Sequence, residues 1–380
     1  MHRPEGTVWG DALPGGPELA GRGSLAVGFT ERTWTDPDRL VIRKGKNGLE
    51  KGRAGRALKL SIFYPAVSSR EDVEYTDYMG RADLGNLQAF TYPGRGERDA
   101  EPLRSAFPAV VVSHGYPGSR MLLSNLCENL ASKGYVAVAI GHTDNTYEDF
   151  LKEGSLESAL VHRSADQRYV IAHLDDFMED EQLHDILNPG KVGLIGFSMG
   201  GYGALRTLGA RWSEAALTEY PDIAEDLREA EDFRGDPHVT AGVLFAPAVF
   251  WLDENRLQDL TAPTLFVCGT ADRTVGYDRV RSFWEKAGNS DRYLVSYQAC
   301  GHNVANNPAP ACAMGESWEI FKRWADPVWD SRNLNQLNAH FVTAFLDTHL
   351  KGVNRLSFLE EFPLPGFREG CAAGVQAEKG

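Results

Sequence analysis

The sequence predicts a single α/β domain over residues 1–380, with a mostly parallel central sheet and helices on both faces. Short, uninterrupted apolar segments, typical of strands buried on both sides, alternate with stretches of helical periodicity. The composition, 42% hydrophobic and 24% charged, is that of a globular chain with a large core. No internal repeat or low-complexity linker divides the chain, so one domain is expected instead of two.

The first expected strand is ALKLSIFYPA at 57–66, which alternates in polarity and stops at Pro65. Alternation is typical of antiparallel strands, so we expect antiparallel strands at the N-terminal edge of the sheet. Continuous apolar strands are expected at 107–114, 135–141, 191–197, 239–246, 262–269 and 292–299. Helices are expected at 122–134, 164–180, 202–210 and 335–352. The core then spans about 57–351, with insertions near 212–234 and 303–332.

Charge and processing signals limit the partners. The 39 basic and 53 acidic residues give a net charge of −14, which disfavours nucleic acid and anionic membranes as partners. Eight basic residues lie between Arg39 and Lys59, and we interpret them as a solvated loop, with an anionic-ligand patch as the alternative. The apolar run from Val239 to Leu252 is too short to span a bilayer, and the N-terminus lacks a signal-peptide pattern.

The cysteines also point to a cytoplasmic protein. There are five, they are scattered, and none has the CxxC spacing of a zinc ribbon or the even number of a disulfide framework. They are Cys127, Cys268, Cys300, Cys312 and Cys371. Cys268 lies in an apolar strand and is expected to be a buried small hydrophobic residue.

The strongest chemical signal is GFSMGG at 196–201, which matches G-x-S-x-G between an expected strand and an expected helix. A nucleophile in this motif stands on a sharp turn, where a side chain at Gly196 or Gly200 would collide with the neighbouring chain. The turn places Ser198 at a helix N-terminus, where N–H groups face developing negative charge. We therefore predict that Ser198 is a nucleophile.

A serine nucleophile needs a base, and the base needs a carboxylate to fix its tautomer. His302, in CGHN, follows the last strand, and Asp272, in GTADRTV, follows the strand before it. All three residues then lie at the carboxyl edge of the sheet, where open α/β sheets bind ligands. The alternatives are a loop histidine that only forms hydrogen bonds and an aspartate that only caps a turn.

Neighbouring segments complete the expected site. The backbone N–H groups of Met199 and of Tyr116, in HGYPGSR, are predicted to form the oxyanion hole, with His114 as a structural hydrogen-bonding residue. His142 and Tyr147 follow a strand at the same edge and are expected to shape the pocket. Because the sequence lacks H-E-x-x-H and the P-loop pattern, we expect no metal and no organic cofactor.

HGYPGSR, GHTDNTYEDF, GFSMGG, GTADRTV and GHN, in this order, resemble serine esterases of the α/β-hydrolase superfamily. The similarity extends to dienelactone-hydrolase-like proteins, the platelet-activating-factor acetylhydrolase family and bacterial cutinase-like polyester hydrolases, over roughly residues 57–351. Dienelactone hydrolases proper use cysteine where Ser198 stands. Animal-type acetylhydrolases have their acid one strand earlier, where no acid occurs before Asp253.

The polyester-hydrolase arrangement matches the position of Asp272 better. It implies that an aromatic residue just after the A-P pair, Phe250 or Trp251, lines the substrate cleft, with a core aromatic as the alternative. The expected function is hydrolysis of a small, apolar or aromatic carboxylic ester through an acyl-enzyme. Two alternatives stay open: an amidase or peptidase with the same triad, and a non-catalytic binding module.

Overall fold

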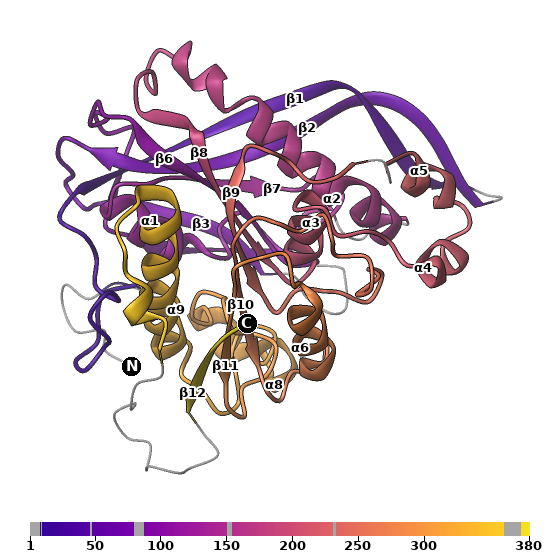
Figure 1. Ribbon diagram of the computed structural model, residues 1–380. Coiled ribbons are helices and arrows are strands. Elements are labelled where there is room, and N and C mark those ends of the chain that lie inside the picture. The colour runs from indigo at the N-terminus through magenta and orange to yellow at the C-terminus, as the bar shows by residue number, and fades with distance from the viewer. Residues whose placement is uncertain are drawn as a thin grey trace.

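The central feature of the computed structural model is one large mixed sheet (Figure 1). The structure describes residues 8, 10–45, 48–79, 87–149, 154–230, 233–360 and 374–380. The strand order is β12-β11-β10-β9-β8-β6-β7-β2-β1-β5. The central strands from β7 to β11 are mutually parallel, while β2 and β12 pair antiparallel with their neighbours. The predicted mostly parallel sheet with antiparallel N-terminal strands is therefore confirmed.

The bounds of the parallel strands agree with the expected ones to within about two residues, except that β8 begins at Leu187 instead of residue 191. The strands of the sheet are β1 (Ala26–Gly45), β2 (Gly48–Ala66), β5 (Gly96–Arg98), β6 (Phe107–Ser113), β7 (Val136–Gly141), β8 (Leu187–Phe197), β9 (Val239–Phe245), β10 (Thr264–Gly269), β11 (Arg292–Tyr297) and β12 (Val375–Lys379). A separate two-stranded sheet, which the sequence did not indicate, consists of β3 (Glu74–Met79) and β4 (Gln88–Pro93).

Helices cover both faces of the sheet. They are α1 (Ser124–Ser132), α2 (Ser155–Ala172), α3 (Met199–Thr207), α4 (Glu214–Glu219), α5 (Ala224–Glu229), α6 (Tyr277–Lys286), α7 (Ala311–Glu316), α8 (Trp318–Phe321) and α9 (Ser331–Leu346). The described residues also include short 3₁₀ turns at Leu174–Met178 and Leu356–Phe358 and a π turn at Asp347–Lys351. α1 packs against α9 and α2 against α3, and the two pairs lie on opposite sides of the sheet (Figure 1).

The basic segment is a long hairpin and not the expected solvated loop. β1 and β2 pair antiparallel along their length, and Figure 1 shows their far end reaching past the sheet. Ile42 is buried, so the hairpin has an apolar side that the many charges conceal in the sequence. Five of the eight basic side chains, those of Arg39, Lys51, Arg53, Arg56 and Lys59, form ion pairs with carboxylates of this chain, which favours internal pairing over an anionic-ligand patch.

α2 begins nine residues before the expected position, at Ser155, and ends at Ala172. The sequence pattern does not indicate the early start because the buried side of this helix is polar instead of apolar. His162, Arg163 and Asp166 are all buried, although such residues usually mark the solvent side of a helix. The amphipathic pattern that reveals most helices is therefore absent here.

The two segments expected as insertions hold short helices. The described part of 212–234 contains α4 and α5, and 303–332 contains α7 and α8. Across the described ranges, no helix combines the length and the apolarity that crossing a membrane requires. Cys127, Cys268 and Cys300 are buried, and these three and Cys312 are free thiols, whereas Cys371 lies outside the described residues.

Candidate active site

Ser198 occupies a strained turn between β8 and α3. Its φ of 54° and ψ of −113° lie outside the regions that residues with side chains normally adopt. Two backbone hydrogen bonds hold this conformation: Ser198 N–H donates to Phe245 O at 2.9 Å, and Ala248 N–H donates to Ser198 O at 3.0 Å. The surrounding chain therefore fixes the serine at the carboxyl end of the central strand.

The glycines on either side of Ser198 are required sterically. A Cβ atom on Gly200 would lie 2.1 Å from the carbonyl oxygen of Ser113, and one on Gly196 would lie 2.3 Å from that of Gly200. Both distances are far below van der Waals contact, and the opposing atoms belong to the backbone of buried elements. The sharp turn is thus possible only with glycine at both positions.

This crowding predicts a large loss of stability for Gly200→Ala. We expect the free energy of unfolding to fall by about 3 kcal/mol or more, because a backbone segment must move to admit the methyl group. The matched control is Gly315→Ala in α7, where an added Cβ meets no atom within 4 Å. The control should stay within about 1 kcal/mol of the wild type. Urea denaturation of both variants measures the difference, and equal midpoints would contradict the packing argument.

Ser198, His302 and Asp272 form one hydrogen-bonded row. His302 Nε2 lies 3.0 Å from Ser198 Oγ, and His302 Nδ1 lies 2.8 Å from Asp272 Oδ2. The other carboxylate oxygen, Oδ1, accepts backbone N–H bonds from Thr274 at 2.8 Å and Val275 at 3.1 Å. The backbone after β10 therefore fixes the orientation of the carboxylate, and the carboxylate fixes the imidazole.

An open cavity of about 940 Å³ exposes the Ser198 and His302 end of this row. Its walls combine aromatic and aliphatic side chains with three solvent-exposed cations. The aromatic and aliphatic members are Tyr116, Leu122, Tyr147, Phe197, Trp318 and Val328, and the cations are Arg273, Lys322 and Arg323. Of the residues expected to shape the pocket, Tyr147 lines this cavity.

Phe250 and Trp251 are placed elsewhere. Neither lines the cavity. Their rings contact each other, the Trp251 ring also contacts the rings of Tyr202 and Tyr220, and the guanidinium of Arg279 lies over Phe250. They pack between α3, α4 and α6. Trp251 is partly buried against the core, as the core-aromatic alternative expects, whereas Phe250 is 37% exposed and is neither a core residue nor a wall of this cavity.

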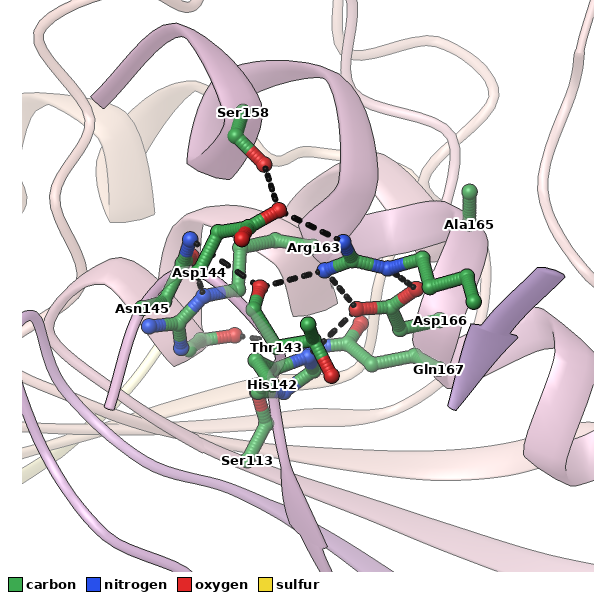
Figure 2. Close-up of polar contacts among 12 residues, drawn as sticks. Ser113, His142, Thr143, Asp144, Asn145, Ser158, Arg163, Ala165, Asp166 and Gln167 are labelled. Carbon is green, nitrogen blue, oxygen red and sulfur yellow. Dashed lines mark hydrogen bonds and ion pairs between the residues drawn. The ribbon is translucent and has the colours of Figure 1, made fainter. Parts of the chain in front are cut away.

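His142 also lies away from the cavity, because its side chain is 0% exposed. Its Nε2 lies 2.8 Å from Ser113 Oγ and its Nδ1 lies 3.0 Å from Asp166 Oδ2, so a second Ser–His–Asp row is sealed in the core (Figure 2). Arg56, from the hairpin, donates to both oxygens of Asp166. No substrate can reach this row, which connects β6, β7, α2 and the hairpin.

The electrostatics of the buried row keep its histidine neutral. Burial, reinforced by the positive charge of Arg163, lowers the pKa of His142 to about 4. Burial alone would raise the pKa of Asp166, but the Arg56 guanidinium and the hydrogen bond from His142 outweigh it and hold that pKa well below its usual range. At neutral pH, His142 Nδ1–H therefore donates to a carboxylate, and Nε2 accepts from the Ser113 hydroxyl.

The loop after β6 approaches Ser198 closely. A Cβ atom on Gly115 would lie 3.6 Å from Ser198 Cβ, and Tyr116, the next residue, lines the cavity. Met199 is the first residue of α3, and N–H groups in the first turn of a helix have no partner within the helix. The two segments predicted to supply backbone N–H groups thus flank the serine.

A serine on a strand–turn–helix, followed in the chain by an aspartate and a histidine at the same edge of a mostly parallel sheet, defines an α/β-hydrolase. The chain belongs to the dienelactone hydrolase family, which matches residues 98–328, more than half of the sequence. Residues 20–153 also match the family "Platelet-activating factor acetylhydrolase, isoform II". The chain is thus a hydrolase by family.

A solved structure and a curated protein illustrate what this chain is similar to. A ferulic acid esterase from Streptomyces cinnamoneus has a solved structure that superimposes with a TM-score of 0.62 at 20% identity, covering 95% of this chain and 99% of the esterase. This likeness shows the fold. A Schizosaccharomyces pombe protein described as "Putative phospholipase A2" is 30% identical over 111 residues, which is 24% of this chain and 25% of that protein. The chain therefore matches only about a quarter of that relative.

Proposed function

We propose that the protein is a serine-dependent carboxylic ester hydrolase that works through an acyl-enzyme. The observation that supports this best is the hydrogen-bonded row of Ser198, His302 and Asp272, whose serine end opens into the 940 Å³ cavity. The esterase and phospholipase descriptions of the similar proteins agree with ester chemistry. The proposal needs no group beyond the residues of this chain.

The mechanism follows from the bonding order in the row. Ser198 Oγ attacks the ester carbonyl while His302 Nε2 takes its proton, and Asp272 stabilises the imidazolium through Nδ1–H. The N–H groups of Met199 and Tyr116 hold the oxyanion. His302 then protonates the leaving alkoxide, which departs. A water molecule, deprotonated by His302, attacks the acyl-enzyme, and the proton returns to Ser198 as the acid is released.

The cavity walls favour an apolar or aromatic substrate. Tyr147 and Phe197 lie close enough to Ser198 to line the same space, and Trp318, whose side chain is 60% exposed, lies at the rim. Burial of each substrate methylene contributes about 0.8 kcal/mol, or roughly a fourfold change in kcat/KM. We therefore expect kcat/KM to rise from acetate to butyrate to a cinnamate-type ester.

Tyr147→Ala tests this assignment of the wall. We expect the variant to lose about tenfold in kcat/KM on butyrate and aromatic esters, because a buried aromatic contact disappears, while acetate hydrolysis changes less. Phe250→Ala is the matched control, since Phe250 is an aromatic residue outside the cavity. A p-nitrophenyl ester series on both variants gives the answer, and equal selectivity in the two would show that Tyr147 does not contact the acyl group.

Assays of the wild-type protein with an anilide and with a fluorophosphonate probe distinguish the proposed esterase from the two alternatives. Hydrolysis of p-nitrophenyl acetate without cleavage of a matched p-nitroanilide supports an esterase, whereas comparable rates on both identify an amidase. A fluorophosphonate probe that labels the wild-type serine excludes a non-catalytic module. A chain that neither hydrolyses esters nor takes the label would refute the proposed function.

A further inference from the structure

The side of α2 that faces the sheet carries a network of polar side chains that take no part in the proposed mechanism. Arg163, Asp166 and Gln167 are each 0% exposed, and Figure 2 shows them beside His142 and Asn145, which follow β7. Burying a guanidinium is costly unless its donors find good partners. The partners of Arg163 therefore indicate what the network stabilises.

Arg163 binds neutral oxygens, two of which belong to the loop beside the nucleophile. Its Nε donates to Asn145 Oδ1 at 2.8 Å and its Nη2 to Gly115 O at 2.8 Å, while Nη1 donates to His114 O. Among the described residues, Arg163 forms no hydrogen bond with a carboxylate. The carboxylate oxygens of the nearby Asp166 accept hydrogen bonds from Arg56 and His142 instead. The cation is thus directed at two consecutive backbone carbonyl groups.

This arrangement sets the direction of the next peptide N–H. The Gly115–Tyr116 peptide is trans, so its C=O and N–H point in opposite directions. With Gly115 O held on the α2 side by Arg163, and also by His114 Nδ1 at 2.7 Å, the Tyr116 N–H faces away from α2. Gly115 adjoins Ser198 and Tyr116 lines the cavity, so this N–H faces the space above the serine.

The same helix also anchors the second donor segment. One turn after Arg163, Gln167 Nε2 donates to Gly200 O at 3.0 Å, in the first turn of α3, and Gln167 Oε1 accepts from Thr207 Oγ1 at 2.8 Å. α2 therefore holds both the loop with Tyr116 and the helix that begins at Met199. One helix thus contacts both segments that are expected to supply the oxyanion-hole donors.

From these contacts we propose that Arg163 is a positioning residue for the oxyanion hole: its guanidinium holds the His114 and Gly115 carbonyls so that the Tyr116 N–H points at the oxyanion. The inference rests on the proposed function and extends it to a residue that touches neither substrate nor nucleophile. A cation on the carbonyl side of a peptide also polarises it and strengthens its N–H as a donor. Arg163 thus acts on the transition state through the backbone.

Arg163→Met, which keeps the length of the side chain and removes its five N–H donors, tests the proposal. We expect kcat to fall by about 10²-fold, the cost of one oxyanion-hole donor, with KM within about threefold of wild type. The affinity for a trifluoromethyl ketone, which places an oxyanion in the hole after Ser198 attacks it, should fall by a similar factor. Arg163→Lys keeps the positive charge but not the planar guanidinium, which donates to both carbonyls at once. We therefore expect a smaller loss of kcat, about tenfold.

Arg206→Met is the matched control. Arg206 is also fully buried and also donates to backbone carbonyls, those of Ala210 and Ala230, away from the serine. The control should lose thermal stability yet keep kcat and the ketone affinity within about threefold of the wild type. A merely structural Arg163 would behave in the same way.

The outcomes separate the two proposals. A folded Arg163→Met protein, checked by circular dichroism, with wild-type kcat and ketone affinity overturns the positioning role and leaves the proposed function intact. A wild-type protein without esterase activity or ketone binding overturns the proposed function itself. Should Arg163→Met fail to fold, Arg163→Lys and Asn145→Ala, which removes the Nε partner, replace it. A parallel fall of kcat and ketone affinity in these variants supports the proposal, and no change in either overturns it.

Discussion

Ser198→Ala is expected to lower kcat on p-nitrophenyl butyrate by about 10⁴-fold or more, because the variant has no nucleophile to form the acyl-enzyme. The residual rate should reflect binding and the oxyanion hole alone. Stability should change little, since the Ser198 backbone bonds to Phe245 and Ala248 do not involve the hydroxyl. Stopped-flow or plate-reader kinetics on matched concentrations of folded protein measure the loss.

A double variant of Ser198 and His302 tests whether the two residues act in one catalytic step. If Ser198 and His302 act as one unit, Ser198→Ala combined with His302→Ala should lose no more activity than the single variants, because the second change removes a group that already has nothing to activate. Additive losses would mean that the two residues act independently. A Ser198→Ala protein that kept its esterase activity would place the reaction elsewhere in the molecule.

The parts of the site that follow local rules could be predicted from the sequence. Gly196 and Gly200 indicate a turn that only glycine permits. In the structure, a Cβ atom at either position would collide with a backbone carbonyl oxygen. Asp272 and His302 each follow an apolar strand, and parallel strands deliver the residues at their carboxyl ends to one edge. Neither inference needs knowledge of distant contacts. The sequence alone can therefore predict that Ser198, Asp272 and His302 lie at the same edge of the sheet.

The polar network under the site could not be predicted in this way. A buried Asp166 is stable only because Arg56 reaches it across 110 positions of sequence, and nothing local to either residue indicates the other. The same holds for Arg163 and the carbonyl of Gly115, 48 positions apart. The position of His142 after a strand predicts a place at the pocket, yet its partners in other elements, Ser113 and Asp166, hold its side chain in the core.

The orientations of two aromatic side chains also depend on tertiary packing. Phe250 and Trp251 follow β9 at the same edge of the sheet as the cavity, but α3, α4 and α6 offer their rings a packing surface. Position along a strand predicts the edge of the sheet and not the direction of a side chain within a loop. That direction depends on which neighbouring element buries more apolar surface, a tertiary property.

Asp272→Asn is expected to lower kcat by about 10⁴-fold at neutral pH with little loss of stability. The reason lies in the two backbone N–H groups of Thr274 and Val275, which both donate to Oδ1. In the variant, these donors require the amide oxygen at the Oδ1 position, so the amide NH₂ must face His302 Nδ1. His302 then accepts at Nδ1 and has its proton on Nε2, where it can no longer accept the proton of Ser198.

Asp253→Asn is the control, since Asp253 is the next acid after β9 and its Oδ1 accepts only a turn hydrogen bond from Asn255 at 2.9 Å among the described contacts. It should keep kcat within about threefold of wild type. Kinetics and thermal melts of both variants distinguish a wrong tautomer of His302 from a loss of folding. A wrong tautomer lowers kcat while the melting temperature of Asp272→Asn stays close to that of the wild type. If Asp272→Asn retained more than a tenth of the wild-type kcat while Asp253→Asn lost most of it, the acid would be Asp253, and the orientation of His302 by Asp272 would have no catalytic consequence.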